Sequence, residues 1–127
     1  HLVLATLHTN DAVSAVTRLT DMGIEPFLLS SSLLGVLAQR LVRKVCTACQ
    51  GRGCSQCGQT GYAGRTGIFE LMVTDDKLRA QIHSKQSEAS LREGALAGGM
   101  VLMREDGERL VQLGITRPEE LLRVTRD

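Results

Sequence analysis

The chain has 127 residues, of which 43% are hydrophobic and 23% are charged, values close to the average of globular proteins. Its formal net charge of +1 lacks the basic excess that is typical of nucleic-acid-binding proteins, and none of its apolar runs approaches the roughly 18 residues of a membrane span. We therefore expect neither a nucleic-acid partner nor direct insertion into a membrane. Because aromatic residues make up only 2%, the predicted core is aliphatic.

The first part of the chain predicts one strand and two helices. Residues 2–7 form an apolar run, which is typical of a buried strand in a parallel sheet. The polar residues 9–11 are candidates for a helix N-cap, and apolar residues recur at helical spacing over 12–22. Pro26 can open a second helix that reaches about residue 34. Because the chain begins in mid-strand and without an initiating methionine, we interpret it as a segment of a longer protein.

The rest of the chain predicts two more strands around a loop, followed by helices. Residues 35–45 are ambiguous in pattern but favour a strand, because they lead directly into a cysteine-rich and glycine-rich loop over 46–64. Residues 65–72 again have a composition that is typical of a strand. Cap and stop signals then predict four helices: one capped within 74–76, one over about 87–96, one over 102–113 and one that begins near Thr116 and Pro118. The predicted fold class is α/β, followed by a small all-helical subdomain.

Two C-x-x-C pairs stand close together in the loop, formed by Cys46, Cys49, Cys54 and Cys57. Each pair brings two thiolates to one side of a tight turn, and two facing turns make a tetrahedral site that suits Zn²⁺. Such a site has no open coordination position, so the metal is expected to be structural. The alternatives are four reduced thiols without a ligand, or an iron–sulfur cluster, although the spacing matches neither of the common ferredoxin runs.

A polar cluster over residues 6–12 follows the predicted first strand. Ligand chemistry in α/β folds gathers at the carboxyl ends of parallel strands. His8 in this cluster is therefore a candidate for ligand contact. The alternative is a capping histidine, or one whose hydrogen bonds are satisfied within the structure.

Several segments resemble the secretion ATPases of the type II and type IV pilus superfamily. Residues 1–12, His-Leu-Val-Leu-Ala-Thr-Leu-His-Thr-Asn-Asp-Ala, are similar to the histidine box of that family. The resemblance covers nearly the whole chain and is strongest over 1–71. Residues 22–27 and 30–35 favour the type II secretion branch. The other segments that match in order are 21–27, 30–33, 38–43 and 61–71.

The resemblance implies the C-terminal part of a RecA-like ATPase core, with an inserted tetracysteine knuckle and a helical C-terminal subdomain. Such ATPases form homohexamers in the cytoplasm, peripheral to the inner membrane, where ATP and Mg²⁺ drive pseudopilus assembly together with the inner-membrane secretion platform proteins. In the family, the residue that matches His8 lies near the γ-phosphate, which implies a catalytic role for His8. Arg40 and Arg65 match family arginines, for which contacts to the nucleotide or to a neighbouring subunit are implied. The alternative for each is a solvated arginine.

The sequence departs from the family pattern in two places. It contains neither the phosphate-binding loop G-x-x-x-x-G-K-[ST] nor the acidic segments that hold Mg²⁺, and both are expected upstream of His1. The chain alone is therefore expected not to hydrolyse ATP. Only residues 50–53 separate the two cysteine pairs, where the family usually has a much longer loop. The predicted parts are the nucleotide-binding core over 1–45, the knuckle over 46–64, a returning strand over 65–72 and the helical subdomain over 73–127.

Two other functions fit parts of the sequence. Residues 46–53 fit the C-x-x-C-x-G-x-G repeat of the cysteine-rich domain of Hsp40 co-chaperones. That domain needs four repeats to fill two zinc sites, whereas this chain has one clean copy and a partial second copy over 54–57. The remaining alternative stays within the ATPase family and makes the chain an oligomerisation and docking module.

Overall fold

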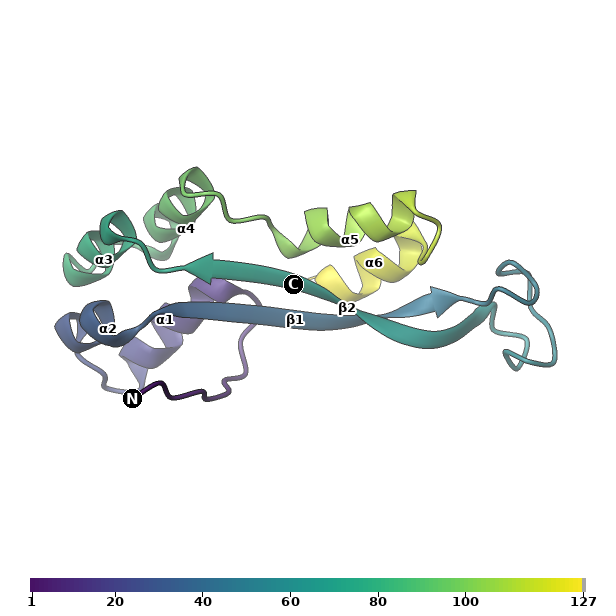
Figure 1. Ribbon diagram of the computed structural model, residues 1–127, viewed down its shortest axis with the longest axis horizontal. Coiled ribbons are helices and arrows are strands. Elements are labelled where there is room, and N and C mark those ends of the chain that lie inside the picture. The colour runs from purple at the N-terminus through teal and green to yellow at the C-terminus, as the bar shows by residue number, and fades with distance from the viewer. Residues whose placement is uncertain (127) are drawn as a thin grey trace. The chain divides into compact units, whose positions relative to one another are not determined.

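The computed structural model describes residues 1–126, and its sheet is a two-stranded ribbon of β1 (Gly35–Val45) and β2 (Tyr62–Val73), shown in Figure 1. At one end the N–H of Thr74 donates to the carbonyl of Leu34 at 3.0 Å. At the other end the N–H of Cys46 donates to the carbonyl of Gly61 at 2.9 Å, so the strands are antiparallel. The predicted strand over 35–45 is confirmed, and β2 begins before residue 65 because its pairing continues to the base of the cysteine loop.

The chain divides into two compact units, and each unit contains part of both strands. Unit 1 consists of residues 1–38 and 70–101, and unit 2 of the described residues within 39–69 and 102–127. The cysteine-rich loop therefore belongs wholly to unit 2. The segment that carries His8 belongs wholly to unit 1.

Unit 1 contains four helices, labelled in Figure 1. Helix α2 contacts α3, α3 contacts α4, and α1 contacts both α2 and α4. The side chains that these helices bury are aliphatic, as the composition predicts: Val13, Val16, Leu29, Leu78, Ile82 and Leu91. The bounds of the four helices are α1 (Ala12–Asp21), α2 (Pro26–Ser32), α3 (Asp76–His83) and α4 (Glu88–Ala97).

The helices of unit 1 begin where the sequence predicts them. The Asp11 carboxylate accepts from the N–H of Ser14 at 2.8 Å and forms a reciprocal capping box with that residue. Asp75 and Ser87 cap α3 and α4 through their own side chains. Each cap satisfies one of the N–H groups that the first turn of a helix leaves unpaired. Helix α2 instead begins at Pro26, whose fixed φ suits the first helical position.

Unit 2 contains two helices in contact with each other, α5 (Met103–Gln112) and α6 (Pro118–Thr125). At Gly107 in α5, an added Cβ would overlap the side chain of Leu121 in α6. A larger residue at this position would require the Leu121 side chain to move. The buried residues of this unit include Val42, Ile68, Met103, Leu110, Leu121 and Val124.

The predicted strand over residues 2–7 is not formed. These residues form neither a helix nor a strand, and no backbone hydrogen bond joins them to another described segment. Leu2, Val3 and Leu4 are 74%, 79% and 88% exposed. A strand requires neighbouring backbone to pair with its N–H and C=O groups, and no described segment supplies it here. The prediction of a buried parallel strand is therefore wrong for this chain.

None of the helices within residues 1–126 combines the length and the apolar character that crossing a membrane requires.

Candidate metal centre

The two cysteine pairs meet in the loop between β1 and β2. Their four sulfur atoms all lie within 4.8 Å of one another. The Sγ atoms of Cys46 and Cys54 are 3.9 Å apart, and so are those of Cys49 and Cys57. The Sγ atoms of Cys54 and Cys57 are 3.7 Å apart. All four cysteines are free thiols, so the loop gathers the predicted ligands into one cluster without a disulfide.

The spacing of the sulfur atoms fits a tetrahedral metal site. A zinc–thiolate bond is about 2.3 Å long, and a tetrahedron of that radius has edges of about 3.8 Å. The three sulfur–sulfur distances of 3.7 to 3.9 Å agree with this value. Four soft thiolate donors select zinc or iron over hard cations such as Mg²⁺. The cluster could therefore hold one metal ion.

Backbone N–H groups point at two of the sulfur atoms. The N–H of Gly53 donates to Cys49 Sγ at 3.1 Å, and those of Cys54 and Gly61 donate to Cys57 Sγ at 3.3 Å. Burial alone would raise the pKa of Cys57, but the N–H groups of Cys54 and Gly61 outweigh it and lower the pKa to about 6. Because the thiolate is the form that binds metal, these donors favour the ligand form of Cys57. The pKa of Cys54, which the backbone N–H of Cys57 would lower, is instead raised to about 11 by burial and by the thiols of Cys49 and Cys57.

Two glycines allow the turns of the loop to approach each other. Gly51 and Gly61 have φ values of +84° and +82°, a region that L-residues with a side chain rarely adopt. A Cβ on Gly61 would lie 2.5 Å from the carbonyl oxygen of Gly51. The glycine-rich composition of the loop is therefore a requirement of its tight packing.

The base of the cysteine loop is bonded to the segment between α5 and α6. The N–H of Val45 donates to the carbonyl of Ile115 at 2.8 Å. The hydroxyl of Thr116 donates to the carbonyl of Arg43, also at 2.8 Å. Thr116 was a candidate for a position at or near the cap of the last helix, and it directly precedes the observed N-cap residue, Arg117. Its side chain is hydrogen-bonded to strand β1 and does not cap the helix.

A buried carboxylate lies in the first turn of α6, at a position where the sequence indicates only an acid facing the helix dipole. Glu120 is 1% exposed. It accepts three hydrogen bonds of 2.7 to 3.1 Å from the backbone and guanidinium of Arg43. It accepts two more, of 2.8 and 2.9 Å, from the guanidinium of Arg123. The Arg123 guanidinium, with Arg43 beside it, holds the pKa of Glu120 well below its usual range against the opposing effect of burial.

Replacing Glu120 by glutamine is expected to destabilise unit 2 by about 1–2 kcal/mol at pH 7, because charge-assisted hydrogen bonds are lost while both arginines keep access to water. The folded pKa of Glu120 lies below its unfolded pKa of about 4.3, so its contribution is complete above the unfolded value and fades as the pH falls below it. Urea unfolding of the wild type and Glu120→Gln at pH 7 and pH 2 measures this difference, because most of the contribution is lost only when the pH approaches the lowered folded pKa; the exposed neighbour Glu119→Gln is the control. An equal deficit at both pH values would contradict the assignment.

The other predicted site residues lie in both units. His8 belongs to unit 1, where it is exposed in the segment before α1. Arg40 on β1 and Arg65 on β2 belong to unit 2. Arg40 is half-buried, and its Nη1 donates to the carbonyl of Val124 in α6 at 3.1 Å. The side chain of Arg65 is exposed and makes no hydrogen bond or ion pair with another described residue. The structure therefore gathers the four predicted cysteines into one site.

The segment that carries His8 ends at a helix start held by long-range contacts. The guanidinium of Arg92 forms an ion pair with the capping carboxylate of Asp11 at 3.0 Å. The N–H of Ala12 donates to the Glu70 carboxylate at 3.0 Å, and Glu70 is only 3% exposed on β2. Negative groups at a helix N-terminus are stabilised by the helix dipole. Both contacts fix where α1 begins, and no local sequence signal indicates either partner.

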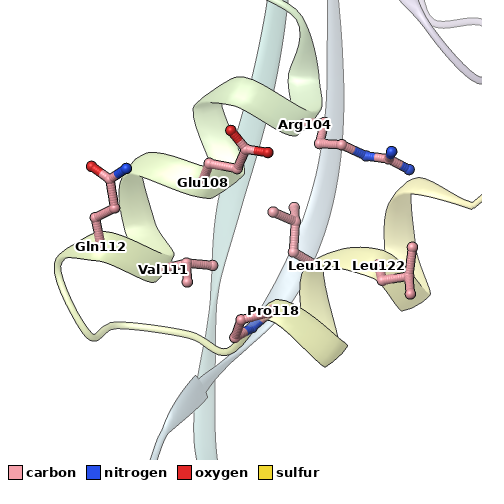
Figure 2. Close-up of a pocket in the computed structure, with 7 residues that line it drawn as sticks. All are labelled: Arg104, Glu108, Val111, Gln112, Pro118, Leu121 and Leu122. Atoms are coloured by element: carbon pink, nitrogen blue, oxygen red, sulfur yellow. The ribbon is translucent and has the colours of Figure 1, made fainter.

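A pocket of about 370 Å³ lies between α5 and α6 in unit 2. Figure 2 shows aliphatic side chains on its walls, with Arg104 and Gln112 among the polar residues that line it. None of the predicted site residues lines this pocket. The residues that line it are Arg104, Glu108, Val111, Gln112, Pro118, Leu121 and Leu122.

The fold is that of part of a pilus motor protein. The whole chain matches 33% of the crystal structure of the pilus retraction motor PilT with bound ADP, with a TM-score of 0.74 and 24% sequence identity. This likeness and the tetracysteine loop confirm the predicted α/β class. At the level of sequence, the chain belongs to the family described as Type II/IV secretion system protein, whose sequence profile matches residues 1–123.

Several relatives cover all or nearly all of the chain. It is 64% identical to the type II secretion system protein HxcR of Pseudomonas aeruginosa, over 100% of the chain and 29% of that relative. It is 47% identical to the type II secretion system ATPase E of Vibrio cholerae, over 100% of the chain and 30% of the relative. The type IV pilus assembly ATPase PilB of Thermus thermophilus is 44% identical over 96% of the chain and 17% of its own length. The family resemblance is thereby confirmed.

The chain spans less than a third of the length of these relatives. The relatives are also longer than the chain within the matched span. The alignments with the Pseudomonas and Vibrio proteins run over 135 and 152 residues, whereas the chain has 127 residues. The chain therefore lacks segments that these relatives contain between the same end points.

Proposed function

We propose that the chain is part of the ATPase that powers type II protein secretion. The observation that carries this proposal is the 64% identity, along the whole chain, with a type II secretion system protein. The longer protein forms a homohexamer in the cytoplasm, peripheral to the inner membrane. It binds ATP and Mg²⁺ and acts on the inner-membrane secretion platform proteins to drive pseudopilus assembly. It has no nucleic-acid partner.

Zinc is the metal that we assign to Cys46, Cys49, Cys54 and Cys57. The tetrahedral sulfur spacing and the all-thiolate donor set support it. With four protein ligands the ion has no open position, so it supplies folding energy and takes no part in the reaction. The cysteine residues and their N–H donors hold the loop over 46–64, which has few apolar side chains of its own.

In the proposed enzyme, His8 donates a hydrogen bond toward the γ-phosphate, and Arg40 and Arg65 contact the nucleotide or a neighbouring subunit. The exposure of His8 and Arg65 supports these roles, because both side chains are accessible to a ligand. Arg40 has an additional structural contact through its bond to Val124. Cationic and donor groups of this kind stabilise the charge that develops on a transferring phosphoryl group.

The 127-residue chain by itself is expected to show no ATP turnover, whereas the full-length protein hydrolyses ATP. The chain contains no phosphate-binding loop, and so it lacks the backbone cradle and the lysine that neutralise the β- and γ-phosphates. The test measures phosphate release by both proteins, together with binding of a fluorescent ATP analogue to the short chain. Turnover by the purified short chain that His8→Ala abolishes would contradict this assignment. A full-length protein without turnover would contradict the proposed function.

A further inference from the structure

Arg117 joins the cysteine loop to the start of α6. It is the N-cap residue of that helix, and its Nη2 donates to the carbonyl of Gly51. A Cβ on Gly51 would overlap this guanidinium in its observed position. The guanidinium also lies 5.5 Å from the centroid of the Tyr62 ring, at a distance typical of a cation–π contact.

The bond from Arg117 fixes a peptide group that supports a metal ligand. The carbonyl of Gly51 and the N–H of Arg52 belong to one planar peptide unit. On the other side of that unit, the N–H of Arg52 donates to the carbonyl of Cys49 at 3.2 Å. The next N–H along the chain, that of Gly53, donates to the sulfur of Cys49 at 3.1 Å. Arg117 therefore orients the turn that places and polarises the Cys49 thiolate.

The positive charge of Arg117 also favours metal binding, as does the hydrogen bond from its side chain to the loop. Four thiolates around one divalent cation carry a net charge of −2, so a nearby cation favours the loaded and deprotonated cluster. The neighbouring Arg43 is the second cation on the Tyr62 ring, at 4.3 Å from its centroid. In other proteins, mutation of a residue that orients a metal ligand from outside the coordination sphere typically lowers the metal affinity by about 10- to 100-fold.

We propose that Arg117 is a positioning residue of the metal centre, which raises its affinity for Zn²⁺ by holding the turn that follows Cys49. This proposal rests on the assignment of zinc to the cysteine cluster. Occupancy of the metal site is linked to the start of α6 through this residue, because its backbone occupies the N-cap position of the helix while its side chain holds the loop. Arg117 thus connects the cysteine loop to the helical pair of unit 2.

The test measures the zinc affinity of the whole 127-residue chain by competition with a chromophoric chelator. We expect Arg117→Ala to weaken zinc binding by about 10- to 100-fold. Arg52→Ala removes an exposed cation from the same turn and is expected to change the affinity by no more than about twofold. Arg117→Lys keeps the charge but not the planar fork, and its affinity should fall between that of the wild type and that of Arg117→Ala.

Thermal unfolding with saturating zinc shows whether each variant folds. If Arg117→Ala does not fold, the comparison of Arg117→Lys with the wild type still decides the test. A wild-type chain that binds zinc while both Arg117 variants bind it equally well would overturn the role of Arg117 alone. Equal losses in Arg52→Ala and Arg117→Ala would also overturn it, because the effect would then be one of general charge. A wild-type chain that binds no zinc would overturn the zinc assignment as well.

Discussion

Cys49→Ser is expected to abolish stoichiometric zinc binding. A serine hydroxyl cannot replace a thiolate as a soft ligand, and the loss should exceed the roughly 100-fold that outer partners of a metal site contribute. Purified wild-type protein should contain about one zinc ion per chain, the number that one tetrathiolate site holds. Metal analysis of both proteins, prepared without chelator, measures the difference.

The structural effect of Cys49→Ser should be local. Hydrogen exchange should increase over residues 46–64, which rely on the metal, while the helices of unit 1 stay protected by their own aliphatic core. Ser55→Ala is the matched control, because Ser55 is exposed in the second cysteine turn and is not a ligand. A wild-type chain without metal, with all four thiols freely titratable under native conditions, would contradict the zinc site.

His8→Ala in the full-length ATPase is expected to reduce turnover by at least about tenfold, which corresponds to about 1.4 kcal/mol of barrier. In other enzymes, removal of one preorganised donor that faces the developing charge of the transition state lowers the rate by about a hundredfold or more. Folding and nucleotide affinity should remain nearly unchanged, because His8 is exposed in the described structure. Steady-state phosphate release and thermal unfolding of the same preparations measure the two effects.

His83→Ala provides the control for His8→Ala, since His83 is an exposed histidine at the end of α3. It should leave both turnover and stability unchanged. If His8→Ala lowers the thermal stability sharply while activity per folded molecule survives, His8 is a structural residue and the catalytic role is wrong.

Local sequence signals predicted those parts of the fold whose causes are local. The caps at Asp11, Asp75 and Ser87 lie within three residues of the N–H groups that they bind, so they are visible in the sequence. The spacing of the C-x-x-C pairs is equally local, and the sulfur cluster follows from it. The ambiguous run that became β1 was assigned correctly because it enters the cysteine loop.

Features that depend on distant partners were missed or wrong. Residues 2–7 have the composition of a buried strand, but strand formation needs neighbours that the described residues do not supply. Glu120 stands where an exposed acid would suit the helix dipole, yet its partner Arg43 lies 77 positions away in the sequence. Glu70 reaches Ala12 over 58 positions. No periodicity or motif in a single sequence encodes such pairs.

Protein secretion by the organism that carries the gene tests the central claim most directly. The gene for the full-length protein is deleted, and the proteins released into the medium are compared with those of the wild type and of a strain complemented with the intact gene. The account predicts that specific exported proteins remain inside the deleted strain, that the intact gene restores their release, and that the His8→Ala gene does not. Normal release from the deleted strain, combined with a loss of surface pili, would contradict it and assign the ATPase to pilus assembly.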